Sequence, residues 1–129
     1  MTYSLPVSSP RGYTEVAEFY RARPVDAQLA PAATTNTNLI TVSSGYWVEG
    51  EVWGANRGAA TTIRIAVRQD ATAIANKHYI SYDEPLGANE SLHTEHLYLI
   101  AGAIVTVYAG SANVSFTFNG LQRQTDVNF

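Results

Sequence analysis

The 129-residue chain contains no cysteine, which excludes a disulfide framework, a thiolate zinc site and a cysteine nucleophile. Charge is also scarce, because charged residues make up 15% of the chain and the net charge is -3. Nucleic-acid binding needs clustered Lys and Arg, so we expect no nucleic-acid partner. No apolar run approaches the ~20 residues of a membrane span, and the N-terminus lacks a charged and then apolar leader. We therefore expect neither a membrane anchor nor a signal peptide.

What is present is a series of short alternating segments separated by turn residues. In the segment 61–69, Ile63 and Ile65 alternate with Arg64 and Arg68, the period of a half-buried strand. Together with the 46% hydrophobic content, these segments predict one all-β domain. We expect an eight-stranded antiparallel β-sandwich with jelly-roll connections. The expected strands are 27–33, 38–42, 46–56, 61–69, 77–86, 91–100, 103–110 and 113–120.

Residues 1–26 differ in composition, since they carry three of the five prolines and three of the arginines. The sequence TEVAEFYR can form two helical turns, which are too short to persist alone. We predict an extended N-terminal arm over 1–26 with at most this short helix, a sandwich domain over 27–120 and a tail over 121–129. Free chain ends are usually disordered unless something ties them down, so we expect a docked arm, which binds a partner or its own domain. Its expected anchors are Tyr13, Phe19, Tyr20, Arg21 and Arg23.

The palindrome WVEGEVW places two tryptophans and two glutamates on one side of a strand and the valines with the glycine on the other. Burying unpaired glutamates would cost several kcal/mol each, so this side is exposed or meets cations. Three interpretations are open. Arg64 and Arg68 of an adjacent strand pair with the glutamates, or the face is a subunit contact rich in hot-spot residues, or it is a sugar-stacking platform. The expected subunit contacts are Trp47, Glu49, Glu51, Trp53 and Arg64.

No motif carries a catalytic signature. The sequence HTEH suggests a metal, but His93 and His96 point to opposite faces of a regular strand, and the helical HExxH context is absent. A structural or surface role is favoured. The acids of YDEP with Glu90 suggest calcium, but the EF-hand pattern is absent. The glycine-rich GANRGAA segment precedes a strand and is interpreted as a turn. We expect no enzyme activity, no cofactor and no metal.

The run 38–120 contains YWVEGEVWGAN, IRIAV, HYISYDEPLGANES and LYLIAGAIVTVYAGSANVSFTFNG in this order. This order resembles the small jelly-roll virion proteins of tailed bacteriophages, which occur as capsid decoration (cement) subunits and as tail or neck fibre modules. The resemblance covers about two-thirds of the chain. It implies a structural, non-enzymatic role, often in trimers.

Three functional hypotheses follow. The first is a capsid decoration protein in the virion, assembled in the host cytoplasm. It would be a homotrimer whose arm runs along the major capsid protein and adds main-chain hydrogen bonds to sheet edges. The second is a tail, neck or fibre structural protein. The third is a carbohydrate-binding host-recognition module that uses Trp47, Trp53 and the tyrosines of KHYISYDE. A metal-assisted hydrolase would need an ion near His93 and His96.

Overall fold

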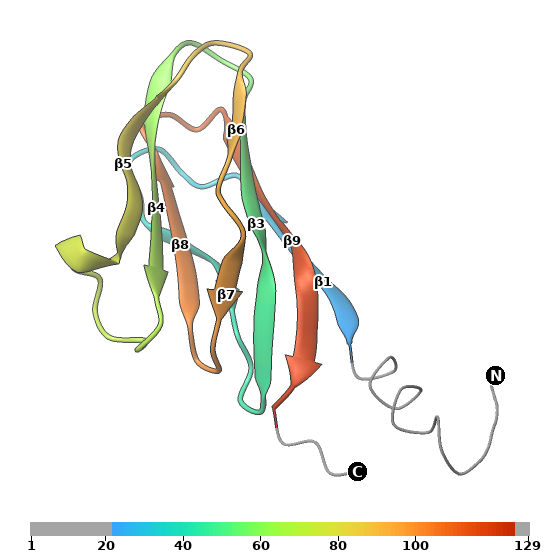
Figure 1. Ribbon diagram of the computed structural model, residues 1–129. Helices are drawn as coiled ribbons and strands as arrows, with labels where there is room; N and C mark the ends of the chain where they lie inside the picture. Colours follow the sequence, from blue (N-terminus) through green and yellow to red (C-terminus); the bar gives the residue numbers. More distant parts are fainter. Residues whose placement is uncertain (1–21, 126–129) are drawn as a thin grey trace, which may run out of the picture.

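The computed structural model describes residues 22–125, and within them every regular element except one 3₁₀ turn is a β-strand (Figure 1). The strands are β1 (Arg23–Leu29), β2 (Thr37–Thr41), β3 (Tyr46–Asn56), β4 (Thr61–Arg68), β5 (Tyr79–Leu86), β6 (Ser91–His93), β7 (Leu97–Leu99), β8 (Ile104–Ala109) and β9 (Val114–Gln124), with the turn η2 (Asn76–His78) before β5. The predicted all-β fold is confirmed. In this part of the chain, no helix has the length and apolar character needed to span a bilayer.

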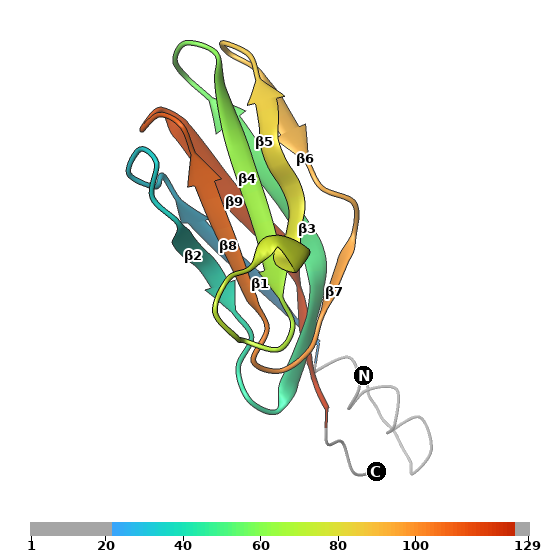
Figure 2. The same ribbon diagram turned by 90° about the vertical axis from the view of Figure 1, so that its left-hand side faces the viewer.

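The strands form two layers. Sheet A has the order β1-β9-β3-β6, with β7 also paired to β3, and sheet B has the order β2-β8-β4-β5. Figures 1 and 2 show the two layers packed face to face. The predicted antiparallel sandwich is therefore confirmed, and its open edges are β1 and β6–β7 in sheet A and β2 and β5 in sheet B.

The connectivity follows from nested pairs. β1 pairs with β9, β2 with β8, β3 with β6 and β7, and β4 with β5, all antiparallel. The chain is thus one long hairpin, and it is rolled up so that β9 also pairs with β3 and β8 also pairs with β4. When β6 and β7 are counted as one interrupted strand, this is an eight-stranded jelly roll. Nine strands replace the expected eight because the segment 91–100 is broken at Thr94–His96.

Both ends of the sandwich extend beyond their expected limits. β1 begins at Arg23 and pairs with β9 over its whole length, so residues 23–26 of the expected arm belong to sheet A. Val25, Ala27 and Leu29 pack against the core, which explains the earlier start, and a proline is tolerated in an edge strand. β9 continues to Gln124, four residues into the expected tail. Residues 1–21 and 126–129 lie outside the described residues, so the rest of the division stays a prediction.

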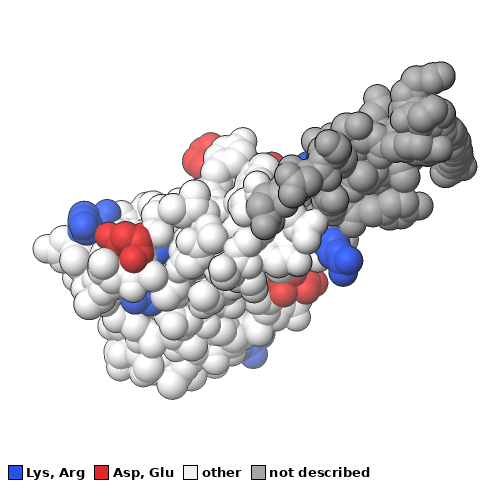
Figure 3. Space-filling view, turned by 90° about the horizontal axis from the view of Figure 1, so that it is seen from below, with Lys and Arg blue, Asp and Glu red and all other residues white. Residues whose placement is uncertain are grey.

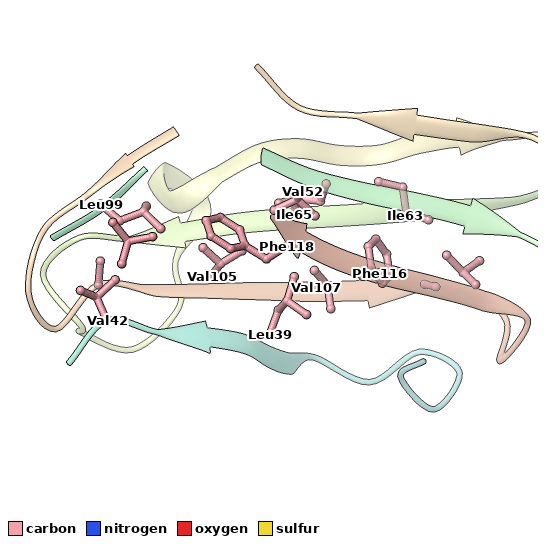
Figure 4. Packing of buried hydrophobic residues seen from close by; sticks show 14 of the residues in the cluster. Leu39, Val42, Val52, Ile63, Ile65, Leu99, Val105, Val107, Phe116 and Phe118 are labelled. Atoms are coloured by element: carbon pink, nitrogen blue, oxygen red, sulfur yellow. The ribbon is translucent and has the colours of Figure 1, made fainter. Parts of the chain in front are cut away.

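The core lies between the sheets and is made by the inward side of each alternating strand (Figure 4). Phe116 and Phe118 of β9 are fully buried, and so are Ile63 and Ile65 of β4, as their alternation predicts. Full burial of such a side chain stabilises the fold by roughly 1.5–3 kcal/mol. The other fully buried large side chains are Leu86, Leu99, Val48, Val52, Val105, Val107 and Val114. This rigid core holds the outer side chains of β3 and its neighbours in place.

Candidate contact surface on sheet A

The outer side of β3 carries the residues that the palindrome points to. Val48 and Val52 are buried in the core, whereas Glu49 and Glu51 are half-buried and Trp53 is 41% exposed. The predicted division of faces is confirmed. We define the sheet A surface as the outward Trp and Glu side chains of β3 together with the charged, aromatic and large aliphatic side chains that contact or flank them on β6, β7, the segment between them, and β9. Its members are Trp47, Glu49, Glu51, Trp53, His93, His96, Tyr98, Leu121 and Arg123.

Charged groups on this surface are paired within the subunit. Glu49 Oε1 lies 2.9 Å from His96 Nε2, and Glu49 Oε2 lies 3.5 Å from Arg123 Nε. The second nitrogen of His96, Nδ1, lies 3.7 Å from Glu51 Oε2. The Arg123 guanidinium also lies 5.7 Å from the centre of the Trp47 ring, at the limit of a cation–π contact. One cation thus connects Trp47 to Glu49, and one histidine connects the two glutamates.

These pairs set the protonation of the two groups at the centre of the surface. The hydrogen bond that Glu49 accepts from His96 raises the pKa of His96 above its ordinary value, and Glu51 adds to the effect. The same hydrogen bond lowers the pKa of Glu49, with a further contribution from Arg123. The carboxylate and the imidazolium therefore stabilise each other's charged forms.

The aromatic members occupy the two flanks of this charged centre. The Trp53 ring stacks on His93 with centroids 4.4 Å apart and an interplanar angle of 28°. Tyr98 contacts His96 edge-on, with ring centroids 5.0 Å apart. Tyr98 is 64% exposed and Leu121 is 37% exposed, and both pair with Glu49 across the neighbouring strands. Apolar surface is therefore presented on both sides of a polar centre whose carboxylates have partners within the subunit.

The expected placement of the histidines on opposite faces is wrong, because both lie over the outer side of β3. The cause is one extra residue between β6 and β7. Thr94 takes the position opposite Val52, donating its N–H to the Val52 carbonyl at 2.9 Å and accepting the Val52 N–H at Oγ1 at 3.1 Å. Leu97 then pairs with Gly50, so the alternation changes phase by one residue. In the part of the chain that the structure describes, no group of three or more His, Asp or Glu side chains could hold a metal ion.

One of the three interpretations of the palindrome, in which Arg64 and Arg68 pair with the glutamates, is wrong. Both arginines belong to β4, which lies in sheet B, because the chain crosses between the sheets after β3. Arg64 Nε donates to Asp83 Oδ1 at 2.7 Å, and its guanidinium lies 4.2 Å from the ring centre of Tyr82 and 4.3 Å from that of Tyr108.

Arg68 is held by polar groups of sheet B. Its Nη2 donates to Asn38 Oδ1 at 2.9 Å and to Thr106 Oγ1 at 2.8 Å. Its Nη1 donates to the Thr72 carbonyl at 3.1 Å. These bonds tie β4 to β2 and β8, so Arg68 stabilises sheet B and leaves the glutamates of β3 to other partners.

Other predicted residues are dispersed. Arg23 is the exposed first residue of β1, whereas the anchors at positions 13, 19, 20 and 21 lie outside the described residues. The tyrosines proposed for glycan binding, Tyr79 and Tyr82, lie on β5 of sheet B, away from Trp47 and Trp53, so the four aromatics do not form one site. Glu90 closes its own turn by accepting the Gly87 N–H at 2.9 Å, which explains its position without a cation.

Sequence reasoning missed His93, His96, Tyr98, Leu121 and Arg123 as members of the surface. Arg123 and Leu121 lie beyond position 120, where the last strand was expected to end. The alternation of inward and outward side chains could have found three of them. Leu121 and Arg123 continue the outward positions of β9, and Tyr98 lies between the inward-facing Leu97 and Leu99 of β7.

No family model and no curated protein matches the chain. A solved structure to which it is similar is a pentameric capsid protein isolated from metagenomic phage sequences. The two share 18% identity at a TM-score of 0.36, over 94% of this chain and 78% of that chain. A similarity this distant carries no argument about function.

Proposed function

We propose that the protein is a non-enzymatic structural subunit of a virion, specifically a capsid decoration protein that docks on the major capsid protein through the sheet A surface. The observation that carries the proposal is the exposure of Trp53, Tyr98 and Leu121 beside a centre whose charges are already paired. Trp, Tyr and Arg are the residues in which binding energy concentrates at protein interfaces.

The paired charges make this surface suitable for burial. An unpaired carboxylate is costly to bury, but Glu49 has both His96 and Arg123 as partners within its own subunit. A shell protein can therefore cover the surface without supplying a cation. In Figure 3, which views the molecule from below, the Lys, Arg, Asp and Glu side chains are few and no large patch of one sign forms, which fits contact with protein better than contact with a polyanion.

The jelly-roll connectivity and the resemblance of residues 38–120 to small virion proteins support a place in the virion. The proposed assembly is a homotrimer, with residues 1–21 as an additional attachment. Trimer formation multiplies the affinity of each weak contact through effective concentration. A position in the tail, neck or fibre is the alternative within the same class, and copy number per virion separates the two, since decoration subunits follow the shell lattice.

Co-sedimentation with shells that lack the protein tests the proposal. The wild type should saturate the shells at a fixed ratio to the major capsid protein. The double substitution Trp53→Ala and Tyr98→Ala should weaken binding at least about tenfold. Tyr82→Ala, which removes an exposed tyrosine from sheet B, is the matched control and should bind like the wild type. Failure of the wild type to bind shells would reject the function, and equal binding by all three would reject the surface.

Carbohydrate recognition is a second candidate, favoured by the exposed Trp53 ring stacked on His93. A sugar ring can stack on such a platform while the carboxylates of β3 accept hydrogen bonds from its hydroxyl groups. A glycan array would show binding that is lost in Trp53→Ala and kept in Tyr82→Ala. An array with no wild-type signal would remove this candidate.

A further inference from the structure

A groove of about 440 Å³ lies along the side of the sandwich where β5, the edge of sheet B, faces β6, β7 and the segment between them, the edge of sheet A. Figure 2 shows these edges running side by side. The aliphatic side chains of Ile80, Leu92 and Leu97 line it, together with the carboxylates of Glu84 and Glu95. Among residues 22–125, neither carboxylate has an ion-pair partner within 4.0 Å.

The two edges beside the groove are irregular. β6 and β7 contain three residues each and are separated by Thr94–His96. The register of β5 shifts twice against β4, and Asp83 has a positive φ of 50°. The backbone N–H and C=O groups on the outer side of such an edge do not pair with a further strand of the sheet, so they can form hydrogen bonds with an added extended segment.

We propose that this groove binds residues 2–8 of a second copy of the chain, TYSLPVS. The inference rests on the proposed function, because it supplies the contact that joins subunits. In this segment Tyr3, Leu5 and Val7 alternate with small polar residues and Pro6. Alternation with period two directs Tyr3, Leu5 and Val7 to one side of an extended chain, where they match the aliphatic lining. Arg11 follows closely and complements Glu84 and Glu95 in charge.

The position of the chain end favours a neighbouring copy as the source. The first described residue, Ala22, adjoins β1, at the edge of sheet A opposite to β6 and β7. Within one subunit the segment would have to pass over the outside of one of the two sheets to reach the groove, and a path over sheet A would cover the surface that the proposed function assigns to the shell. The 13 residues between 8 and 22 span up to ~45 Å when extended, enough to reach an adjacent subunit. Segment and groove are different surfaces, so the contact is heterologous, and it gives a closed ring when the rotation between subunits closes.

Full-length variants test the exchange by sedimentation velocity. The wild type should self-associate, and either Ile80→Glu in the groove or Leu5→Asp with Val7→Asp in the segment should give monomers. Ile100→Glu is the matched control, because Ile100 is 58% exposed and does not line the groove. Mixing the groove variant with the segment variant should restore a one-to-one complex, since each supplies what the other lacks.

Three results would overturn the inference: a monomeric wild type, self-association that survives Ile80→Glu, or a mixture that stays monomeric. Shell binding separates this failure from failure of the proposed function. Ile80→Glu should still bind shells through Trp53 and Tyr98, although with lower avidity. Conversely, Trp53→Ala with Tyr98→Ala should keep self-association while losing shell binding.

Discussion

Gly50 of β3 and Gly120 of β9 lie directly opposite each other, and the ring of Phe118 covers both. A Cβ atom at Gly50 would lie 2.7 Å from Phe118 Cζ and would overlap the carbonyl oxygen of Asn119. A Cβ atom at Gly120 would lie 2.9 Å from Phe118 Cε2. The glycine at the centre of the palindrome therefore leaves room for an aromatic ring to lie across the strand pair.

Gly50→Ala should destabilise the protein by about 1–3 kcal/mol, because both the backbone of β9 and the Phe118 ring must move. Urea unfolding measures the change. Gly54→Ala on the same strand is the matched control, since its Cβ atom would lie 3.4 Å from Phe116 Cε1, an ordinary contact. The control should change stability by less than about 1 kcal/mol. Equal effects at the two glycines would contradict this account of the packing.

Alternation along single strands predicted much of this fold. The inward positions of Ile63, Ile65, Phe116 and Phe118 follow from period two, and so does the division of β3 into a valine face and a Trp/Glu face. These features depend on residues close together in the chain, so the sequence displays them directly.

Alternation does not show which residues the outer side chains contact. Arg123, the partner of Glu49, lies on a strand more than seventy positions later, and only the pairing of β3 with β9 brings the two side chains together. Arg64 follows β3 in the sequence but lies in the other sheet. The extra residue beside Thr94 brings His93 and His96 to one face. In the sequence it shows only as a break in the alternation between β6 and β7, which does not reveal the position of the extra residue. Long-range pairing and a one-residue bulge decided the composition of the surface.

Asn56, buried at the end of β3, should be a strong determinant of stability. Its Nδ2 lies within hydrogen-bond distance of the carbonyls of Ala59, Leu86 and Gly87, at 2.9–3.2 Å, and its Oδ1 accepts the Gly58 N–H at 2.9 Å. Asn56→Ala would leave these backbone groups without their partner and should cost about 2–4 kcal/mol.

Thermal and urea unfolding measure this loss. The matched control is Asn119→Ala, which removes an exposed amide of β9 that makes no side-chain hydrogen bond to any residue in 22–125. The control should stay within about 0.5 kcal/mol of the wild type. A small effect at Asn56 would show that water replaces the amide at this turn.

The Glu49–His96 pair predicts how stability depends on pH. The raised pKa of His96 means that its contribution is fully present below the ordinary value of 6.5 and is lost as the pH rises through the folded-state pKa. The lowered pKa of Glu49 means that its contribution is present above 4.5 and is lost as the pH falls through its folded-state pKa. The stability difference between the wild type and His96→Gln should therefore be largest between these values and should shrink toward alkaline pH.

Melting temperatures of both proteins from about pH 4 to 9 measure the difference. In a Glu49→Gln background most of the pH dependence of the His96→Gln effect should disappear, with Glu51 at 3.7 Å as the remaining carboxylate partner. A pH dependence that is unchanged in that background would assign the effect to Glu51 or to another titrating group.

Thr94 should fix the bulge that gives the sheet A surface its two histidines. Its hydroxyl accepts the Val52 N–H at 3.1 Å and donates to the Glu95 carbonyl at 2.8 Å, in a buried position. Thr94→Val keeps the shape but leaves the Val52 N–H unsatisfied, so it should cost about 1–3 kcal/mol. Thr117→Val, on the outer side of β9, is the matched control and should cost less than about 0.5 kcal/mol.

If the bulge relaxes, NMR titration should also show the pKa of His96 falling toward its ordinary value, because the imidazole would move away from Glu49. Destabilisation with an unmoved His96 titration would show that Thr94 stabilises this edge without holding the imidazole in place.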